Sequence, residues 1–152
     1  MRQEHEMDIR QLRYFIAVAD LRSFTRAADQ FYLTQTSMSY QISNLEKEIG
    51  AQLFVRHRNN VSLTTSGEAF YRHAQKILGM VDVAVQDAKS AALGFEQVLR
   101  VGFLGLHEQY FLPMYIERFS QNHPEVNVMM KQANPKNLRT LLKAEAMDVA
   151  TA

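Results

Sequence analysis

Residues 34–50 read TQTSMSYQISNLEKEIG, and this stretch decides how the rest of the chain is interpreted. Its apolar side chains recur at intervals of four, three and four residues, which is the spacing of one face of an α-helix. They are Met38, Ile42, Leu45 and Ile49. Thr34 can cap the beginning of such a helix and Gly50 can end it. We therefore predict a helix with one buried face.

The opposite side of this predicted helix begins with uncharged hydrogen-bonding groups and becomes charged only at Glu46, Lys47 and Glu48. One interpretation is a surface helix with a Ser/Thr-rich first turn. The other is a surface that reads DNA base edges, because short or planar donors and acceptors suit that task. The neighbouring segments discriminate between the two.

Composition sets the broad class. The chain has 152 residues and 47% hydrophobic content, which predicts a globular protein of one ordinary domain or two small ones. It has no cysteine, so neither a disulfide framework nor a thiolate metal site is expected. The charged N-terminus does not resemble a secretion signal, and no apolar run is long enough to cross a bilayer. A soluble, cytoplasmic protein without membrane or cofactor is the simplest expectation.

Net charge neither supports nor excludes a nucleic-acid partner. The whole chain carries +1, and residues 1–65 contain eight basic and seven acidic side chains. DNA binding must therefore depend on where Arg26, Arg56 and Arg58 lie and not on bulk charge.

The segments before residue 34 predict two further helices. Asp8 can cap an amphipathic helix over IRQLRYFIAVADL, and Ser23 or Thr25 can cap a short second helix, RAADQF. Two helices, a short turn and a helix with a polar leading edge form the order of a helix-turn-helix. An unrelated three-helix bundle would have the same order.

The segment after residue 50 predicts a hairpin. Residues 52–55 and 61–63 read as two short strands, and Arg56-His57-Arg58-Asn59-Asn60 lies between them as the turn. Such a hairpin is either a solvated tip or a wing whose arginines reach a phosphate or the minor groove. A wing is favoured because the hairpin follows the polar helix directly.

Taken together, residues 12–68 closely resemble the DNA-binding domain of LysR-type transcriptional regulators. The matching features are LRYF-x-AVA, SFTRAA, TQ-x-x-x-S-x-QI-x-x-LE-x-E-x-G, LF-x-R and LT-x-x-G. The resemblance implies a winged helix-turn-helix that binds double-stranded DNA. It implies base reading by Gln35, Thr36, Ser39 and Tyr40. It implies contacts of the DNA backbone and wing by Thr25, Arg26, Thr34, Ser37, Ser43, Arg56, Arg58 and Asn59.

The chain departs from the family pattern at three positions. Thr36 stands where proline is usual, and Tyr40 stands where arginine or glutamine is usual. Asn59 replaces the second arginine of the wing, and Arg58 lies one position earlier. The fold and general role are compatible with these changes, but the preferred operator does not follow from the family.

A long helix is predicted from Thr65, where Thr65 and Glu68 have the spacing of a capping box, to about Gly94. Its apolar and small residues alternate at four and three positions, and a second such register widens the stripe. We expect a second copy of the chain to cover this stripe, with packing onto the same chain as the alternative. The family's linker helix is likewise a dimerisation element. The predicted dimerisation residues are Phe70, Ala74, Ile77, Val81, Ala84 and Ala88.

Residues 95–152 alternate strand, helix, strand, helix and strand, which predicts a parallel α/β sheet. This part resembles the beginning of the family's effector-binding domain, including the passage RFSQNHPEV. Three strands are too few for a sheet covered on both faces, so we expect an incomplete domain. By resemblance, one wall of the effector cleft contains Gly102, Leu104, Gly105 and Asn134.

The expected fold class is thus mostly α: a winged helix-turn-helix and a long dimerisation helix, followed by a truncated, periplasmic-binding-protein-like α/β regulatory domain. The expected boundaries are an N-terminal extension over 1–7, the DNA-binding domain over 8–65, the linker helix over 66–94 and the regulatory part over 95–152.

The expected function is that of a sequence-specific transcriptional regulator acting as a dimer, or a tetramer in intact relatives, on an inverted-repeat operator. Intact relatives respond to a small-molecule effector and contact RNA polymerase. The alternative is a fragment that binds DNA or heterodimerises without responding to a signal. An enzyme is disfavoured, because the five histidines are scattered and neither a phosphate-binding glycine loop nor a nucleophile elbow is present. No metal site is expected.

Overall fold

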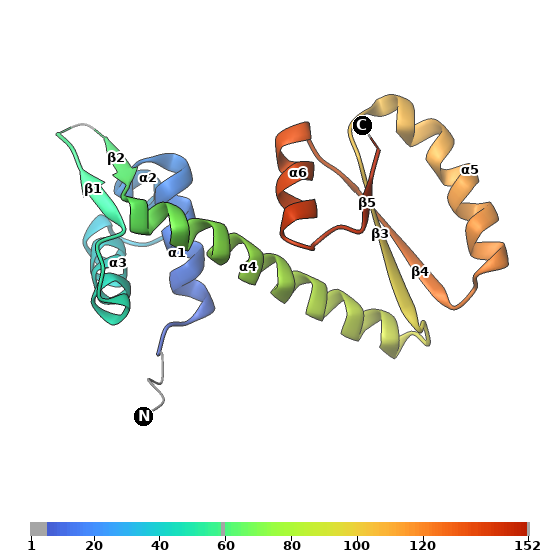
Figure 1. The fold of residues 1–152 in the computed structure, drawn as a ribbon, viewed down its shortest axis with the longest axis horizontal. Helices are drawn as coiled ribbons and strands as arrows, with labels where there is room; N and C mark the ends of the chain where they lie inside the picture. The colour runs from blue at the N-terminus through green and yellow to red at the C-terminus, as the bar shows by residue number, and fades with distance from the viewer. Residues whose placement is uncertain (1–5, 59, 152) are drawn as a thin grey trace. The chain divides into compact units, whose positions relative to one another are not determined.

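The computed structural model describes residues 6–58 and 60–151, and the chain divides within one long helix into two compact units, residues 1–78 and 79–152. Figure 1 labels the helices and strands. The helices are α1 Ile9–Leu21, α2 Phe24–Gln30, α3 Gln35–Ile49, α4 Thr65–Ala92, α5 Leu106–Asn122 and α6 Pro135–Lys143. The strands are β1 Phe54–Arg56, β2 Val61–Leu63, β3 Gln97–Phe103, β4 Val126–Gln132 and β5 Val149–Ala150.

The first three helices begin and end where local capping chemistry predicts. Asp8 and Gln11 form a capping box at α1, and the hydrogen bond from the Gln11 backbone N–H holds the pKa of the Asp8 carboxyl below its usual range. Ser23, and not Thr25, caps α2 by accepting from the Arg26 backbone N–H at 3.2 Å. The predicted caps of α3 are confirmed, since Thr34 caps its beginning and α3 ends at Gly50 with φ of 77°.

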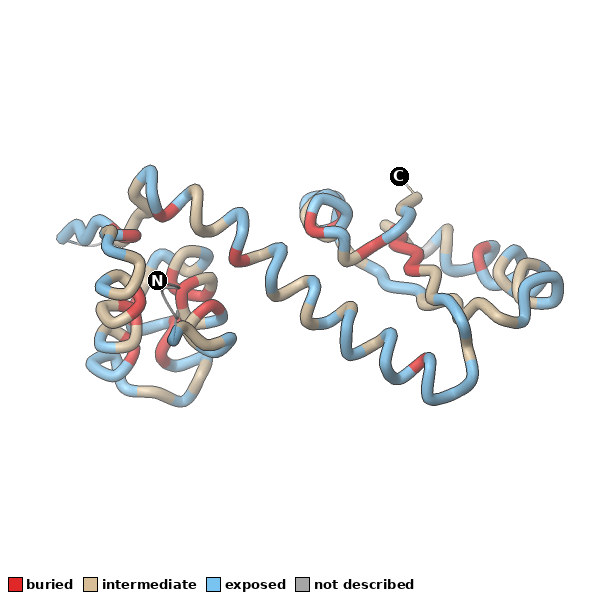
Figure 2. The backbone as a smooth tube through the Cα atoms, turned by 60° about the horizontal axis from the view of Figure 1, so that its bottom comes forward, coloured by how far each residue is buried: buried red, intermediate tan, exposed pale blue. Residues whose placement is uncertain are grey.

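The core of the first unit lies where α1, α2 and α3 face one another, and Figure 2 shows the buried segments gathered on these inner faces. Its largest fully buried side chains are Phe15, Val18, Met38, Ile42, Leu45 and Leu53. The buried face predicted for α3 is confirmed, although Ile49 is only half-buried.

Phe15 joins the helices to the hairpin and to α4. Its ring centroid lies 5.2 Å from that of Phe54 in β1 and 5.0 Å from that of Phe70 in α4. The hairpin pairs antiparallel, with Phe54 opposite Leu63. A Cβ on Gly67 would lie 2.1 Å from the Leu53 carbonyl oxygen, so only glycine allows α4 to approach the hairpin this closely.

The beginning of α4 differs from the prediction. Thr64, and not Thr65, supplies the capping hydroxyl, which accepts from the Gly67 backbone N–H at 2.9 Å. The same hydroxyl donates to the Gln52 carbonyl at 2.7 Å. A hairpin contact distant in sequence therefore selects the cap, which helical spacing alone does not reveal.

The Tyr71 hydroxyl secures α4 to α1. It donates to Asp20 Oδ1 at 2.5 Å, and Gln75 Nε2 donates to the Tyr71 oxygen at 2.9 Å. Burial, reinforced by the Asp20 carboxylate, raises the pKa of Tyr71 well above its ordinary value, so the phenol keeps its proton. This bond fixes how α4 leaves the helix-turn-helix.

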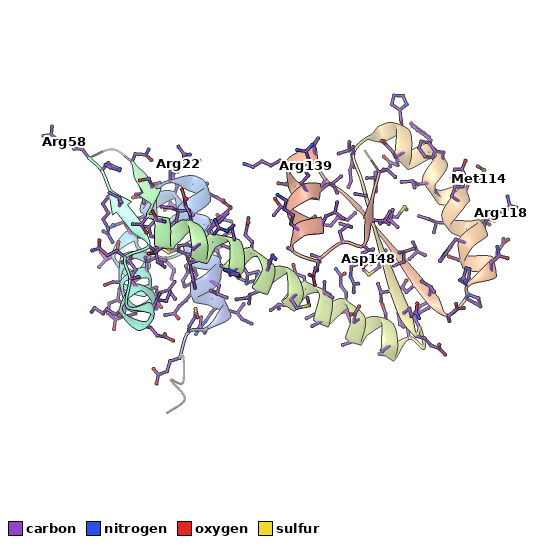
Figure 3. All side chains as sticks on the ribbon, viewed as in Figure 1. Arg22, Arg58, Met114, Arg118, Arg139 and Asp148 are labelled. Atoms are coloured by element: carbon purple, nitrogen blue, oxygen red, sulfur yellow. The ribbon has the colours of Figure 1, made fainter. Side chains whose placement is uncertain are left out.

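The second unit contains the predicted parallel sheet, in the order β4-β3-β5, with α5 and α6 on its two sides (Figure 1). Helix α5 begins well before its proline. The helix starts at Leu106, where Glu108 accepts from the Gly105 backbone N–H at 3.1 Å, so Pro113 lies inside the helix. Figure 3 labels Met114 and Arg118 on α5, and both side chains are exposed.

The last turns of α4 belong to the second unit. The buried Arg100 guanidinium of β3 pairs with Asp87 of α4, and its Nη1 lies 3.7 Å from Asp148 Oδ2. Asn127 Nδ2 donates to the buried Ser90 hydroxyl at 2.7 Å. Polar contacts thus hold this half of α4 to the sheet.

Replacing the central aromatic residue tests how far the first unit depends on it. Phe15→Ala should lower the free energy of unfolding of this unit by about 3–5 kcal/mol, because the substitution leaves a cavity between α1, the hairpin and α4. Urea denaturation followed by circular dichroism measures the loss. Ile9→Ala, at a 43% exposed position of the same helix, is the control and should cost less than about 1 kcal/mol. Equal losses in the two variants would contradict the central role of Phe15.

Candidate nucleic-acid interface

The four residues expected to read bases lie on the side of α3 opposite its buried face. Gln35, Thr36 and Tyr40 are exposed, Tyr40 to 63%, and Ser39 is half-buried. The first three turns of this face carry no charged side chain. The structure therefore brings the four predicted residues together on one accessible, uncharged surface.

Two of these residues are already joined. Gln35 Nε2 donates to the Ser39 hydroxyl at 3.0 Å, one helical turn further along α3. A carboxamide has two N–H groups and one oxygen, so this bond uses only part of its hydrogen-bonding capacity. The contact holds the Gln35 amide along the helix while its remaining groups are accessible to a base edge.

The N-terminus of α3 is fixed by hydroxyl groups. Thr34 Oγ1 accepts from the Ser37 backbone N–H at 3.1 Å and donates to Ser37 Oγ at 2.9 Å. Both residues were expected to contact the DNA backbone, and both are exposed. Their mutual bonds also give them a structural role, because they order the turn that carries Gln35 and Thr36.

Glu46 has a role that periodicity did not predict. It was assigned to the solvated part of α3, but its Oε1 accepts from the backbone N–H groups of Leu53 at 2.7 Å and Phe54 at 3.2 Å. One carboxylate therefore joins α3 to the hairpin. The signal in the sequence is weak, because a glutamate eight residues before a strand is common.

The hairpin presents its arginines differently. The Arg56 guanidinium lies over the Phe24 ring, 4.3 Å from its centroid, which anchors the side chain by a cation–π contact. Arg58 lies at the tip and points away from the fold (Figure 3). Asn59, the third predicted wing residue, is outside the described residues. His57 and Asn60 close the turn by a backbone hydrogen bond of 2.8 Å.

The other predicted backbone contacts come from two helices. Thr25 and Arg26 are exposed in the first turn of α2, and Ser43 is half-buried in α3. Exposed uncharged groups on α3, cationic groups on the hairpin and Arg26 on α2 together form a surface that can bind a polyanion and read bases beside it. These roles remain predictions.

The six predicted dimerisation residues have unequal environments. Ala74 is fully buried in the core of its own chain, and Phe70 packs against that core. Ile77 is 44% exposed, Ala84 and Ala88 are exposed, and Val81 is half-buried. The alternative of packing on the same chain therefore holds for the first three turns of α4, and a partner would contact the later ones.

The predicted effector residues separate into two groups. Leu104, Gly105 and Asn134 follow the carboxyl ends of the neighbouring parallel strands β3 and β4, where the Ala133 N–H donates to the Phe103 carbonyl at 3.1 Å. Gly102 is buried within β3, where an added Cβ would lie 2.6 Å from Leu138 Cδ2 of α6. Gly102 thus permits close helix packing.

Within residues 6–58 and 60–151, no cluster of three or more His, Asp or Glu side chains has a geometry that could hold a metal ion. In the same part of the chain, no helix combines the length and apolarity needed to cross a membrane.

Comparisons with known proteins identify the family. Residues 9–68 match the family model described as "Bacterial regulatory helix-turn-helix protein, lysR family". The transcriptional regulator BudR of Klebsiella aerogenes is 39% identical over 145 residues, which cover 93% of this chain and 100% of that protein. The regulator BenM of Acinetobacter baylyi is 38% identical over 142 residues, which cover 93% of this chain and 46% of that protein.

Two solved structures extend the similarity to complexes. Full-length CbnR with its target DNA has a TM-score of 0.59 and 28% identity, covering 95% of this chain and 50% of that chain. The DNA-binding domain of BenM with the benA site 1 DNA has a TM-score of 0.55 and 45% identity, covering 57% and 97% respectively. The chain spans about half the length of the full-length relatives it matches.

Removing the cap of α3 should loosen the base-reading turn. Thr34→Ala is expected to destabilise the unit by about 1 kcal/mol, because the Ser37 N–H loses its acceptor. Hydrogen exchange of the Ser37 amide in the free protein should accelerate. Thr36→Ala, which removes a neighbouring exposed hydroxyl, is the control and should leave that amide unchanged. Unchanged exchange in Thr34→Ala would contradict the capping role.

Proposed function

The chain belongs to the LysR family of bacterial helix-turn-helix regulatory proteins, and from this premise we propose that it binds double-stranded DNA sequence-specifically, as a dimer, to regulate transcription. The observation that carries the proposal is the uncharged, exposed edge of α3 at Gln35, Thr36, Ser39 and Tyr40. A solvated helix face usually carries Glu and Lys, whereas short or planar uncharged donors and acceptors such as these can pair with base edges.

Each base-reading residue offers a distinct chemistry. The Gln35 amide can form a bidentate pair with adenine, and the Thr36 methyl can contact a thymine methyl. Tyr40 offers a hydroxyl to a base or phosphate, without the preference for guanine that arginine would bring. Relatives with proline at position 36 and arginine at position 40 present different groups to the bases. We therefore expect this chain to prefer a different DNA site from theirs.

Affinity would come from a few localised cations. Arg26, Arg56 and Arg58 lie on exposed elements of the same unit, and each neutralised phosphate adds to the salt dependence of binding. The stacking of Arg56 on Phe24 favours one direction of this side chain before DNA arrives. This arrangement supports a DNA partner despite a net charge of only +1.

Two copies joined through α4 would present two recognition helices to an inverted repeat. The exposed side chains of Ile77, Ala84 and Val85 supply the apolar contact surface on this helix. A rigid pair fixes the separation of the recognition helices and therefore the spacing of half-sites.

Regulation would enter through the second unit. Leu104, Gly105 and Asn134 lie after the ends of β3 and β4, where ligands of parallel α/β sheets usually bind. A small-molecule effector contacting these residues would change the equilibrium between DNA-binding states and the contact with RNA polymerase. By linkage, bound DNA would change effector affinity by the same factor.

The base-reading role predicts a loss confined to the cognate site. Gln35→Ala should weaken binding to a site selected by the wild-type protein from random sequences by roughly 5- to 150-fold, the range for one bidentate pair. Affinity for random DNA at the same salt should hardly change, because phosphate contacts remain. Fluorescence anisotropy measures both.

Gln30→Ala is the matched control, since Gln30 is an exposed glutamine at the end of α2. It should bind both DNAs like the wild type. An equal loss of Gln35→Ala on cognate and random DNA would refute base reading and favour a sequence-tolerant DNA binder.

The proposed dimer predicts sensitivity to charge on α4. Val81→Glu combined with Ala84→Glu should yield a monomer in analytical ultracentrifugation and abolish cooperative binding to two half-sites, because the charges would be desolvated between the helices. Lys76→Glu changes the net charge by the same two units outside the apolar stripe and should stay dimeric. A monomeric double variant with wild-type affinity for the two-half-site operator would contradict the role of the dimer.

A further inference from the structure

Tyr32 occupies an unusual position between α2 and α3. Its backbone is left-handed, with φ of 55°. Its N–H donates to the Asp29 carbonyl at 3.2 Å, and the Leu33 N–H donates to the Ala28 carbonyl at 2.9 Å. These two bonds form the Schellman arrangement that ends a helix, in which Tyr32 takes the left-handed position normally given to glycine.

A tyrosine at this position costs free energy that a glycine would not. The left-handed conformation brings Cβ too close to the following carbonyl, which costs roughly 1–2 kcal/mol for a residue with a side chain. Glycine takes the left-handed positions at Gly50, with φ of 77°, and Gly94, with φ of 89°, whereas Arg22, Tyr32 and Glu145 are left-handed residues that carry a side chain. Glycine at position 32 would relieve this local strain.

The Tyr32 side chain receives no compensation from its own chain. It is 98% exposed, and no hydrogen bond or ring contact joins it to any residue of 6–58 or 60–151. The turn is held by backbone hydrogen bonds and by Leu33, which packs against the core. No described residue contacts the aromatic ring, so the ring is available to a partner.

We infer that Tyr32 is a DNA-backbone contact, with its ring against a deoxyribose and its hydroxyl donating to a phosphate beside the base-reading turn. This inference rests on the proposed DNA-binding function. Tyr32 lies two residues before Thr34 and three before Gln35, and all three side chains are exposed.

The chemistry of the side chain favours the sugar-phosphate backbone over a base. A phenol offers one donor and one apolar ring, which match a phosphate oxygen and the hydrophobic face of a sugar. The contact adds no charge, so it contributes affinity without releasing counterions. Loss of the Tyr32 contact should therefore lower DNA affinity equally at all salt concentrations, unlike loss of Arg56 or Arg58. It should lower affinity for all DNA sequences, unlike loss of Gln35.

Two substitutions separate the hydroxyl from the ring. Tyr32→Phe should weaken binding to cognate and random DNA alike by roughly tenfold, as expected for one hydrogen bond to a charged acceptor. Tyr32→Gly should weaken both further and yet raise the Tm of the first unit by roughly 4–16 °C, because the left-handed strain is relieved. In both variants the slope of log K against log salt should equal that of the wild type.

Glu145→Gly is the matched control for relief of strain. Glu145 is also left-handed, with φ of 56°, but lies in the second unit. This variant should keep wild-type DNA affinity. Arg56→Ala is the control for a charged contact and should reduce the salt slope by roughly one.

The outcomes are distinguishable. Wild-type affinity of Tyr32→Gly on both DNAs would overturn the inference, and so would a lowered Tm, since the side chain would then support the fold. A loss confined to cognate DNA would also overturn it, because it would make Tyr32 a base reader. The proposed function fails separately, if the wild-type protein shows no preference for any selected site or if Gln35→Ala loses equally on both DNAs.

Discussion

The packing of the Phe15 ring is the interaction on which the first unit depends. Three short helices cannot bury enough apolar surface by themselves, and Phe15 recruits Phe54 of the hairpin and Phe70 of α4 into the same core. The Glu46 carboxylate then binds the backbone beside the hairpin to α3. The hydrogen bond from Tyr71 to Asp20 binds α4 to α1. Because these contacts use the inner faces of the elements, one whole side of α3 stays free.

The free side of α3 and the hairpin divide the proposed task of DNA recognition. Uncharged groups on the helix serve specificity, and cations on the hairpin serve affinity. Tyr32 would add a neutral backbone contact at the cost of local strain, which is a common compromise at functional sites. With such a division, a chain of nearly zero net charge can bind a polyanion, since local placement replaces bulk attraction.

Helix α4 belongs to both units, because the boundary between them lies within this helix. Its first turns are held by Phe15 and Asp20, whereas its last turns are held through Asp87 and Ser90 to the sheet. In the proposed function, a ligand bound at the sheet would shift Arg100 and Asn127, which contact Asp87 and Ser90 of α4. In the proposed dimer, such a change would affect the spacing of the half-sites through α4.

The sequence by itself determined the order and type of every element, the buried face of α3, the parallel sheet and the family, because these follow from periodicity, capping groups and motif spacing within short windows. Only the tertiary structure decided that Thr64 caps α4, that Glu46 binds the hairpin backbone, that Ala74 is covered by its own chain and that Arg100 joins α4 to the sheet. These contacts link residues whose partners are chosen by three-dimensional packing, which no local pattern encodes. The strained backbone of the exposed Tyr32 belongs to the same class, since a left-handed turn is visible only when both flanking helices have been placed.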